Sequence, residues 1–289
     1  MLVVLLKILS WLPLSVLYRV SDICARLASM FYRRNLVKRN LTAVFKNRSP
    51  EQLGKIADKF YHHLADVFVE SIKLHQFSIE ELTARISLEK SVDYQKLKQE
   101  QSPVLLFSAH FGNWEWYIPA VHHYLVPMNA VYKPLSNSRM NKWMINVRMR
   151  HGANVVPMKN TLRAAKKMTG RTGLALGADQ APRKNIKSKI WVEFMGKETA
   201  FYSGLINMPF LTQYPAYFTY LHKLARGNYE LRTIELGRPP YGKDENGVLQ
   251  KYLEICEEVI KSNPEQWLWT HNRWKYDRRN NEELIKFSS

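Results

Sequence analysis

A histidine and a glutamate lie five positions apart, just after an apolar run of the chain. Residues 104–107 are hydrophobic at every position, which is typical of a strand buried on both faces. His110 and Glu115 follow, with Gly112 between them where the backbone can turn tightly. Ligands of open α/β sheets bind at the carboxyl ends of strands, so this is where a reactive pair is expected.

The two side chains suit general-base chemistry on a hydroxyl group. Imidazole has a pKa of about 6.5, so His110 can accept a proton near neutral pH, and a nearby carboxylate can orient the ring. Positions i and i+5 of a regular helix point about 140° apart. The pair therefore meets only if His110 precedes the helix and Glu115 lies in its first turn, with Asn113 or Ser108 as the cap. A merely structural pair is the competing interpretation.

The segment from His110 to Glu115 resembles the His-x4-Asp/Glu motif of glycerolipid-type acyltransferases. Its sequence, His-Phe-Gly-Asn-Trp-Glu, resembles this motif in the bacterial lipid A late acyltransferase family. Further segments that resemble this family, in the family's order, are residues 131–137, 148–150, 178–180 and 264–275. Several motifs in one order are much more specific than one.

The resemblance implies transfer of a fatty acyl chain from an acyl carrier protein thioester to a hydroxyl of a phosphorylated lipid A precursor. His110 would remove the acceptor proton while Glu115 orients the ring. Backbone N–H groups at the helix start after His110 are the expected donors to the oxyanion. We expect direct attack without an acyl-enzyme, because no Ser or Cys nucleophile with a base is evident. We expect no metal and no other cofactor.

Charged residues outside the pair are the candidates for substrate binding. Arg148 matches the family's functional arginine best, and it would pair with Glu115 or Asp179 or bind a phosphate. Asp179 would orient an arginine or the acceptor. Lys133 stands where the family often has arginine, so only a point charge is expected there. A solvated helix charge is the alternative for Arg148, and a capped turn for Asp179. The expected substrate-binding residues are Arg148, Asp179, Lys133, Asn113 and, as a fallback, Arg150.

The chain is strongly basic, with 43 Lys and Arg against 25 Asp and Glu, a net charge of +18. Such a surface attracts polyanions and anionic membranes. We find no zinc finger, RNP-like segment, basic zipper or helix-turn-helix, and therefore expect no nucleic acid. The resemblance implies two anionic partners instead, an acyl carrier protein and the phosphorylated lipid A precursor. From the basic charge we also expect the anionic inner membrane as a partner.

The first 18 residues are almost entirely apolar, with Lys7 as the only charge and Pro13 as an interruption. A bilayer span needs about 20 apolar residues, so this segment could span the membrane or lie in its interface. Basic residues follow at positions 33, 34, 38, 39, 46 and 48, which favours the cytoplasmic side. We expect an N-terminal anchor at the cytoplasmic face of the bacterial inner membrane. A buried core helix is the alternative.

Candidate strands and helices alternate from residue 103 onward. This pattern predicts an α/β fold with a mixed, mostly parallel central sheet flanked by helices, glycerolipid acyltransferase-like, after an N-terminal membrane-associated helix. We expect a membrane-anchoring and basic helical segment over 1–48 and an acyltransferase domain over 49–289. The predicted strands are 104–107, 129–133, 155–158, 173–177, 190–195 (at an edge), 215–221 and 229–236. The predicted helices include 138–151, 161–168 and 247–262, and others that start after capping residues Ser49 and Ser78.

Two other functions stay open. An acyltransferase acting on another lipid acceptor, a lysophospholipid or a glycolipid, would share the His-x4-Glu chemistry, although the Trp-rich closing motif favours lipid A. A non-catalytic basic protein that binds membranes or nucleic acid would keep the charge but would need neither His110 nor Glu115.

Overall fold

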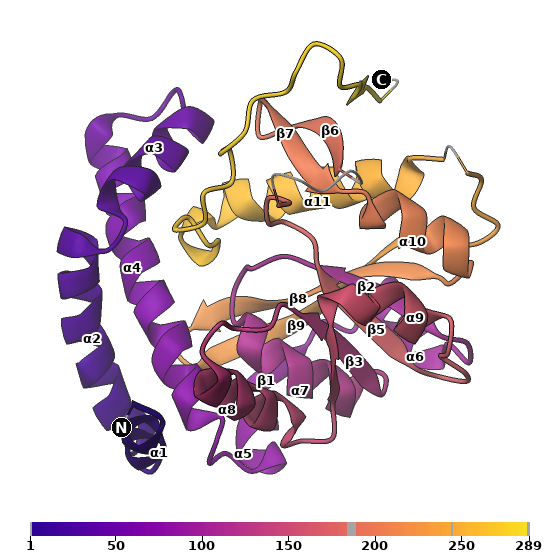
Figure 1. The fold of residues 1–289 in the computed structure, drawn as a ribbon. Coiled ribbons are helices and arrows are strands. Elements are labelled where there is room, and N and C mark those ends of the chain that lie inside the picture. The colour runs from indigo at the N-terminus through magenta and orange to yellow at the C-terminus, as the bar shows by residue number, and fades with distance from the viewer. Residues whose placement is uncertain (1, 184–188, 244, 288–289) are drawn as a thin grey trace.

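The computed structural model describes residues 2–183, 189–243 and 245–287. Its centre is a seven-stranded sheet in the order β1-β9-β8-β2-β5-β3-β4 (Figure 1). All neighbouring strands in it are parallel except β8 and β9, which form an antiparallel hairpin. The predicted mixed, mostly parallel sheet is confirmed. Its strands are β1 (Ile86–Leu88), β2 (Val104–Ser108), β3 (Met128–Tyr132), β4 (Asn154–Pro157), β5 (Gly173–Gly177), β8 (Ala216–Ala225) and β9 (Asn228–Gly237).

Helices cover both faces of this sheet, and β2 shows why its sequence is apolar throughout. Leu105 and Phe107 belong to a core shared with α10 (Gly204–Thr212) and α11 (Gly247–Ser262). Val104 and Leu106 belong to a second core, shared with α7 (Trp114–Tyr124). In Figure 1, α7 and α8 (Ser138–Met149) lie on the opposite side of the sheet from α10 and α11. Burial of one such side chain contributes about 1.5–3 kcal/mol, so a polar residue at any of these positions would be costly.

The strand expected at 190–195 lies outside the central sheet, and its prediction as an edge strand is wrong. It is β6 (Lys189–Phe194), the middle strand of a small sheet between β7 (Lys197–Tyr202) and β10 (Leu284–Ile285). The unpredicted β7 pairs with it through a two-residue turn, Met195–Gly196, in which both φ angles are positive. Such turns match the twist of antiparallel strands, and so they join hairpins.

Four N-terminal helices form a column beside the sheet (Figure 1). They are α1 (Leu2–Ser10), α2 (Leu14–Phe31), α3 (Arg34–Val44) and α4 (Pro50–Lys73). The predicted start of α4 is confirmed, because Ser49 Oγ accepts from the Gln52 amide while Gln52 Oε1 accepts from the Ser49 amide. The division of the chain between residues 48 and 49 stays a prediction.

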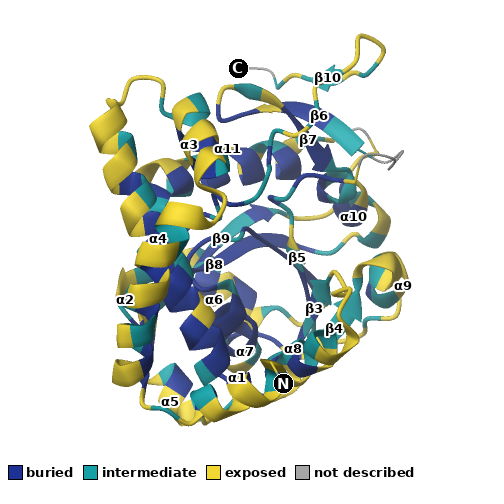
Figure 2. Cartoon of the chain, turned by 60° about the vertical axis from the view of Figure 1, so that its left-hand side comes forward, coloured by how far each residue is buried: buried dark blue, intermediate teal, exposed yellow. Residues whose placement is uncertain are grey.

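No helix within residues 2–183, 189–243 and 245–287 is long and apolar enough to cross a membrane, so the expected N-terminal anchor is not confirmed. The outer side of α2 and α4 carries many exposed residues (Figure 2).

Shorter helices complete the fold. They are α5 (Ile79–Thr83), α6 (Val92–Gln99) and α9 (Thr161–Ala165), with two 3-10 turns at Met158–Asn160 and Pro264–Gln266. The capping box predicted at Ser78 is confirmed at the start of α5. The helix predicted over 161–168 is shorter than expected and ends at Ala165. The helix predicted over 138–151 is α8, which ends before Gly152 with its φ of +92°.

Candidate active site

The first feature of the site is a contact between His110 and Asp179 at the edge of the sheet. The strands β2 and β5 are parallel neighbours in which Ser108 is paired with Gly177. His110 and Asp179 each lie two residues beyond this pair, so the parallel register brings them together. The His110 Nδ1 atom lies 2.7 Å from Asp179 Oδ1. Asp179 is therefore the carboxylate that contacts the imidazole.

The Asp179 carboxylate is buried, with 2% of its surface exposed, and both of its oxygens have donors. Trp267 Nε1 donates to Oδ2 at 2.9 Å. Burial raises the pKa of the Asp179 carboxyl, but the charge and hydrogen bonds of His110, with the Trp267 donor, outweigh this and hold it at about 2. Burial lowers the pKa of His110, but the Asp179 carboxylate outweighs burial, so the pKa lies above its usual value. The carboxylate therefore stays ionised and favours the imidazolium.

The proton on the neutral imidazole can be assigned from these contacts. An ionised carboxylate can only accept, so His110 Nδ1 carries the hydrogen and Nε2 keeps its lone pair. The amide Nε2 of Gln180 lies 3.1 Å from His110 Nε2 and, by the same logic, donates to it. The His110 side chain keeps 26% of its surface exposed. The lone pair needed by a general base therefore faces an amide donor, and the ring is only partly buried.

Glu115 forms a bidentate ion pair with Arg148. Arg148 Nε donates to Oε2 at 2.9 Å, and its Nη2 donates to Oε1 at 2.7 Å. The Glu115 charge also raises the pKa of His110. The expectation that Glu115 orients His110 is corrected, because the Arg148 fork holds this carboxylate and the ring is held by Asp179. The expectation that Arg148 pairs with Glu115 agrees with the structure.

Asn113 caps α7, as one of the two residues expected there. Its Oδ1 accepts from the amides of Glu115 at 3.1 Å and Trp116 at 2.9 Å, and the side chain is fully buried. The Asn113 cap uses the amides of Glu115 and Trp116, so these two are not open to an oxyanion. The expectation that helix-start amides stabilise the oxyanion stays a prediction for the remaining amides, such as that of Trp114. The expectation that Asn113 binds a substrate is corrected, because its side chain is buried.

Two glycines allow the site to close up. Gly112 has a φ of +58°, and a Cβ there would lie 1.6 Å from the Leu221 carbonyl oxygen, so the turn admits no side chain. A Cβ on Gly177 would lie 3.2 Å from His110 Cε1. Gly112 is required by the backbone conformation of the turn, and the missing side chain of Gly177 leaves room for the His110 imidazole.

The other two predicted residues lie apart from the His110–Asp179 contact. Arg150 is exposed, and its Nε lies 3.5 Å from the carbonyl oxygen of Phe77, in the segment between α4 and α5. Its role as a substitute for Arg148 stays a prediction. Lys133 is exposed just after β3, and its role toward a phosphate stays a prediction.

Sequence reasoning did not assign Gln180 or Trp267 to the site. Only their positions in the sequence could have indicated them. Gln180 follows Asp179 just after a predicted strand, and Trp267 lies in the closing motif. The same closing motif supplies His271, whose Nε2 accepts from the Ala181 amide at 2.9 Å. Burial lowers the pKa of His271 to about 4, so it stays neutral and holds the segment that carries Asp179 and Gln180.

A partly exposed imidazole with a carboxylate on Nδ1 and an amide donor on Nε2, at the strand ends of a mostly parallel sheet, defines an α/β protein equipped for general-base group transfer. The family model of the bacterial lipid A biosynthesis acyltransferases matches residues 1–276. The chain belongs to this family and is an acyltransferase. A search of curated proteins found no match to the chain.

Proposed function

We propose that this enzyme transfers a fatty acyl group from an acyl carrier protein thioester to a hydroxyl of a phosphorylated lipid A precursor. The observation that carries the mechanism is the 2.7 Å contact between His110 Nδ1 and Asp179, which presents Nε2 as the base. Family membership supports lipid A as the acceptor class.

The reaction needs one proton carrier. The acceptor hydroxyl displaces the Gln180 amide from His110 Nε2, which takes the proton as the oxygen attacks the thioester carbonyl. A C–O bond forms, and the C–S bond breaks as the tetrahedral intermediate collapses. The imidazolium then returns the proton to the departing thiolate. Asp179 stabilises the imidazolium between these steps.

Gln180 supplies a donor for the oxyanion in this scheme. The hydroxyl releases its amide from the imidazole, and we assign the released amide to the carbonyl oxygen under attack. Loss of one oxyanion donor costs about 10²–10³ in kcat in well-studied sites, which is the upper end of the effect expected for Gln180. This role takes over from the amides of Glu115 and Trp116, which Asn113 engages.

Arg148 and Lys133 supply positive charge for the acceptor phosphate. Glu115 engages Nε and Nη2 of Arg148, which fixes the plane of the guanidinium. We assign the third nitrogen, Nη1, to a phosphate oxygen, and the exposed Lys133 to a second, less directional contact.

An apolar groove of about 530 Å³ between α2 and α4 receives the acyl chain in this proposal. Its walls include Ala28, Leu64 and Phe68. Leu268 and His271 also line it, and the Leu268 amide donates to the His110 carbonyl at 3.1 Å. The groove thus shares a wall with the backbone of the proposed base.

The N-terminal helices bring the enzyme to the cytoplasmic face of the inner membrane. Exposed apolar residues on and between α1 and α2 are Leu2, Val4, Leu5, Ile8, Trp11, Val16, Ile23, Leu27, Met30 and Phe31. An apolar helix face with basic neighbours such as Arg19, Arg26 and Arg34 binds anionic lipid interfaces. Loss of vesicle binding in an Ile23→Ser, Leu27→Ser variant would support this contact, and unchanged binding would contradict it.

Mass spectrometry of the acceptor tests the function. Purified enzyme is incubated with an acyl carrier protein thioester and either a lipid A precursor, a lysophospholipid or a glycolipid. We expect the lipid A precursor alone to gain the mass of one acyl group. A mass gain on another lipid would identify that lipid as the acceptor in place of lipid A. Salt-sensitive nucleic-acid binding without any acyl transfer would contradict the proposed function and indicate a binding protein.

A further inference from the structure

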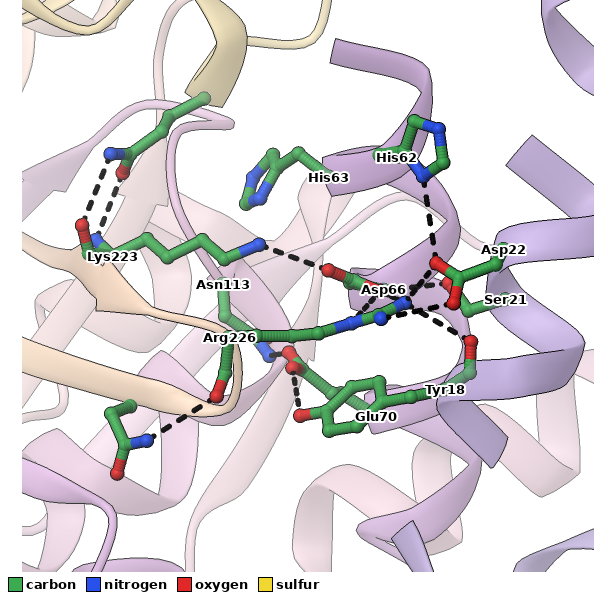
Figure 3. Close-up of polar contacts among 12 residues, drawn as sticks. Tyr18, Ser21, Asp22, His62, His63, Asp66, Glu70, Asn113, Lys223 and Arg226 are labelled. Carbon is green, nitrogen blue, oxygen red and sulfur yellow. Dashed lines mark hydrogen bonds and ion pairs between the residues drawn. The ribbon is translucent and has the colours of Figure 1, made fainter. Parts of the chain in front are cut away.

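A row of buried polar side chains on α4 lies behind the catalytic turn, which we define as residues 110–113. His63, Asp66 and Glu70 make up this α4 polar row, and their i, i+3, i+7 spacing puts them on one helix face. Each is at most 3% exposed. Figure 3 shows them between α2 on one side and Lys223 and Arg226 of the β8–β9 hairpin on the other. Polar groups buried this deeply are costly unless they are paired, so their partners indicate what the row holds.

Two members of the row hold the catalytic turn directly. His63 Nε2 lies 3.1 Å from the Gly112 carbonyl oxygen. Burial lowers the pKa of His63 to about 3, so the ring is neutral and its Nε2–H donates. Glu70 Oε2 accepts from Asn113 Nδ2 at 2.7 Å. Successive residues of the turn are thus bound from α4, one through its backbone and one through its side chain.

Glu70 joins three elements at one carboxylate. Tyr18 of α2 donates to Oε1 at 2.7 Å, and Tyr229 of β9 donates to Oε2 at 2.6 Å, beside the Asn113 donor. Burial raises the pKa of the Glu70 carboxyl to about 6, against the lowering effect of the two tyrosine donors. Near neutral pH the ionised group accepts all three bonds.

The Asn113 amide has only one orientation that serves both of its neighbours. Its nitrogen must face Glu70 so that its oxygen can accept from the first amides of α7. The direction of the cap therefore depends on the Glu70 acceptor. Since Glu115 lies in this first turn, its ion pair with Arg148 depends on the same contact.

Asp66 is a natural control, because it lies on the same helix face and is also buried, but contacts other elements. Its oxygens accept from Ser21 Oγ at 2.8 Å, Lys223 Nζ at 3.0 Å and Arg226 Nη2 at 2.7 Å. Its removal would weaken the packing of α2 and the hairpin on α4 without removing a contact to the catalytic turn.

We propose that Glu70 is a positioning residue for the catalytic turn, assisted by His63. It orients the Asn113 amide, and through that cap it sets the first turn of α7 and the place of Glu115. Its kinetic consequence rests on the proposed function, whereas its structural consequence can be measured without any substrate.

The structural test is amide hydrogen exchange at Glu115 and Trp116 in the full chain. Glu70→Ala should speed exchange at these two amides, whereas Asp66→Ala should leave them protected as in the wild type. Glu70→Gln keeps a carbonyl acceptor for Asn113 and should restore protection. Equal exchange in the two alanine variants, or no recovery with glutamine, would overturn the proposal.

The kinetic test follows kcat and KM for acyl transfer in the same variants. Glu70→Ala should lower kcat by up to about 10²-fold, the cost of an ångström-scale misplacement, with little change in KM. Glu70→Gln should recover most of this loss. A wild type that transfers no acyl group would remove the proposed function but leave the exchange result standing.

A second pair of variants, in which the charges of residues 70 and 113 are swapped, covers the case in which Glu70→Ala does not fold. Asn113→Asp keeps the cap oxygen but sets a second carboxylate against Glu70, so exchange at Glu115 and Trp116 should rise. Adding Glu70→Gln supplies an amide donor to the introduced carboxylate and should restore protection, giving a favourable coupling in the double-mutant cycle. Additive effects would overturn the proposal.

Discussion

The imidazole Nδ1 of His110 lies 2.7 Å from the Asp179 carboxylate, although the two residues are 69 positions apart in the chain. The contact exists because β2 and β5 are adjacent and parallel, so both strands deliver their next residues to the same edge of the sheet. A buried carboxylate at Nδ1 leaves Nε2 as the only nitrogen that can accept a proton. The order of importance among the acidic residues follows from this geometry.

Asp179→Asn should reduce kcat far more than Glu115→Gln. The amide cannot hold the Nδ1–H tautomer and cannot offset the imidazolium charge, and in a serine-protease triad such a change costs on the order of 10⁴-fold. Glu115→Gln loosens Arg148 but leaves the imidazole partner in place. Steady-state kinetics on both folded variants would check the order. A larger loss of kcat with Glu115→Gln would indicate that Glu115, rather than Asp179, is the carboxylate that supports His110.

The rate should rise with pH through the His110 ionisation, because only the neutral ring can act as a base. Asp179 raises the pKa of His110 above its usual value, so the midpoint of log(kcat/KM) should lie above about 6.5. In Asp179→Asn the midpoint should move to lower pH, because the stabilising charge is lost while burial still lowers the His110 pKa. A midpoint that stays in place or moves upward would contradict the assignment.

Gly177→Ala should impair the reaction while leaving the fold intact. The new methyl group would lie 3.2 Å from His110 Cε1 and would push the ring by a few tenths of an ångström. Because about 1 Å of misplacement can cost 10²-fold, we expect a loss of about tenfold in kcat. Gly54→Ala is the matched control, since a Cβ there meets no atom within 4 Å. Equal rates in the two variants would mean that the ring position is not limiting.

Leu64→Trp should narrow the apolar groove and shift the donor preference toward shorter acyl chains. The indole ring would occupy space between α2 and α4 that we assign to the acyl chain of the donor. Leu162→Trp, on the exposed surface of α9, serves as the control. The ratio of kcat/KM for a long and a short acyl donor is the readout. An unchanged ratio in Leu64→Trp would mean that the acyl chain binds outside this groove.

Much of the fold could be predicted because it depends on local patterns. The apolar run of β2, the cap at Ser49 and the amphipathic α11 each identified an element close to its observed bounds. The small sheet was missed for two reasons. The two-residue turn Met195–Gly196 was not recognised as a hairpin connection to β7. The pairing of β10 with β6 is long-range, so the alternation in β6 does not indicate it.

The same limit explains what was missed in the site. The sequence indicated His110, Glu115, Arg148 and Asp179 as candidates, but their pairing depends on which strands are adjacent. Since β2 and β5 are adjacent and parallel, Asp179, which follows β5, takes the place expected for Glu115. Glu70 could not be recognised either, because a glutamate on an amphipathic helix is usually exposed, and its burial depends on how α2 and the hairpin pack on α4.

The most direct test of the account is the rate of acyl transfer by His110→Ala, measured beside the wild type with an acyl carrier protein thioester and a lipid A precursor. Folding of the variant would be established first from its thermal unfolding. We predict a folded protein whose transfer rate falls by at least about 10³-fold, since the scheme contains no second base. A folded variant with near-wild-type transfer would contradict the role of His110 and, with it, the mechanism.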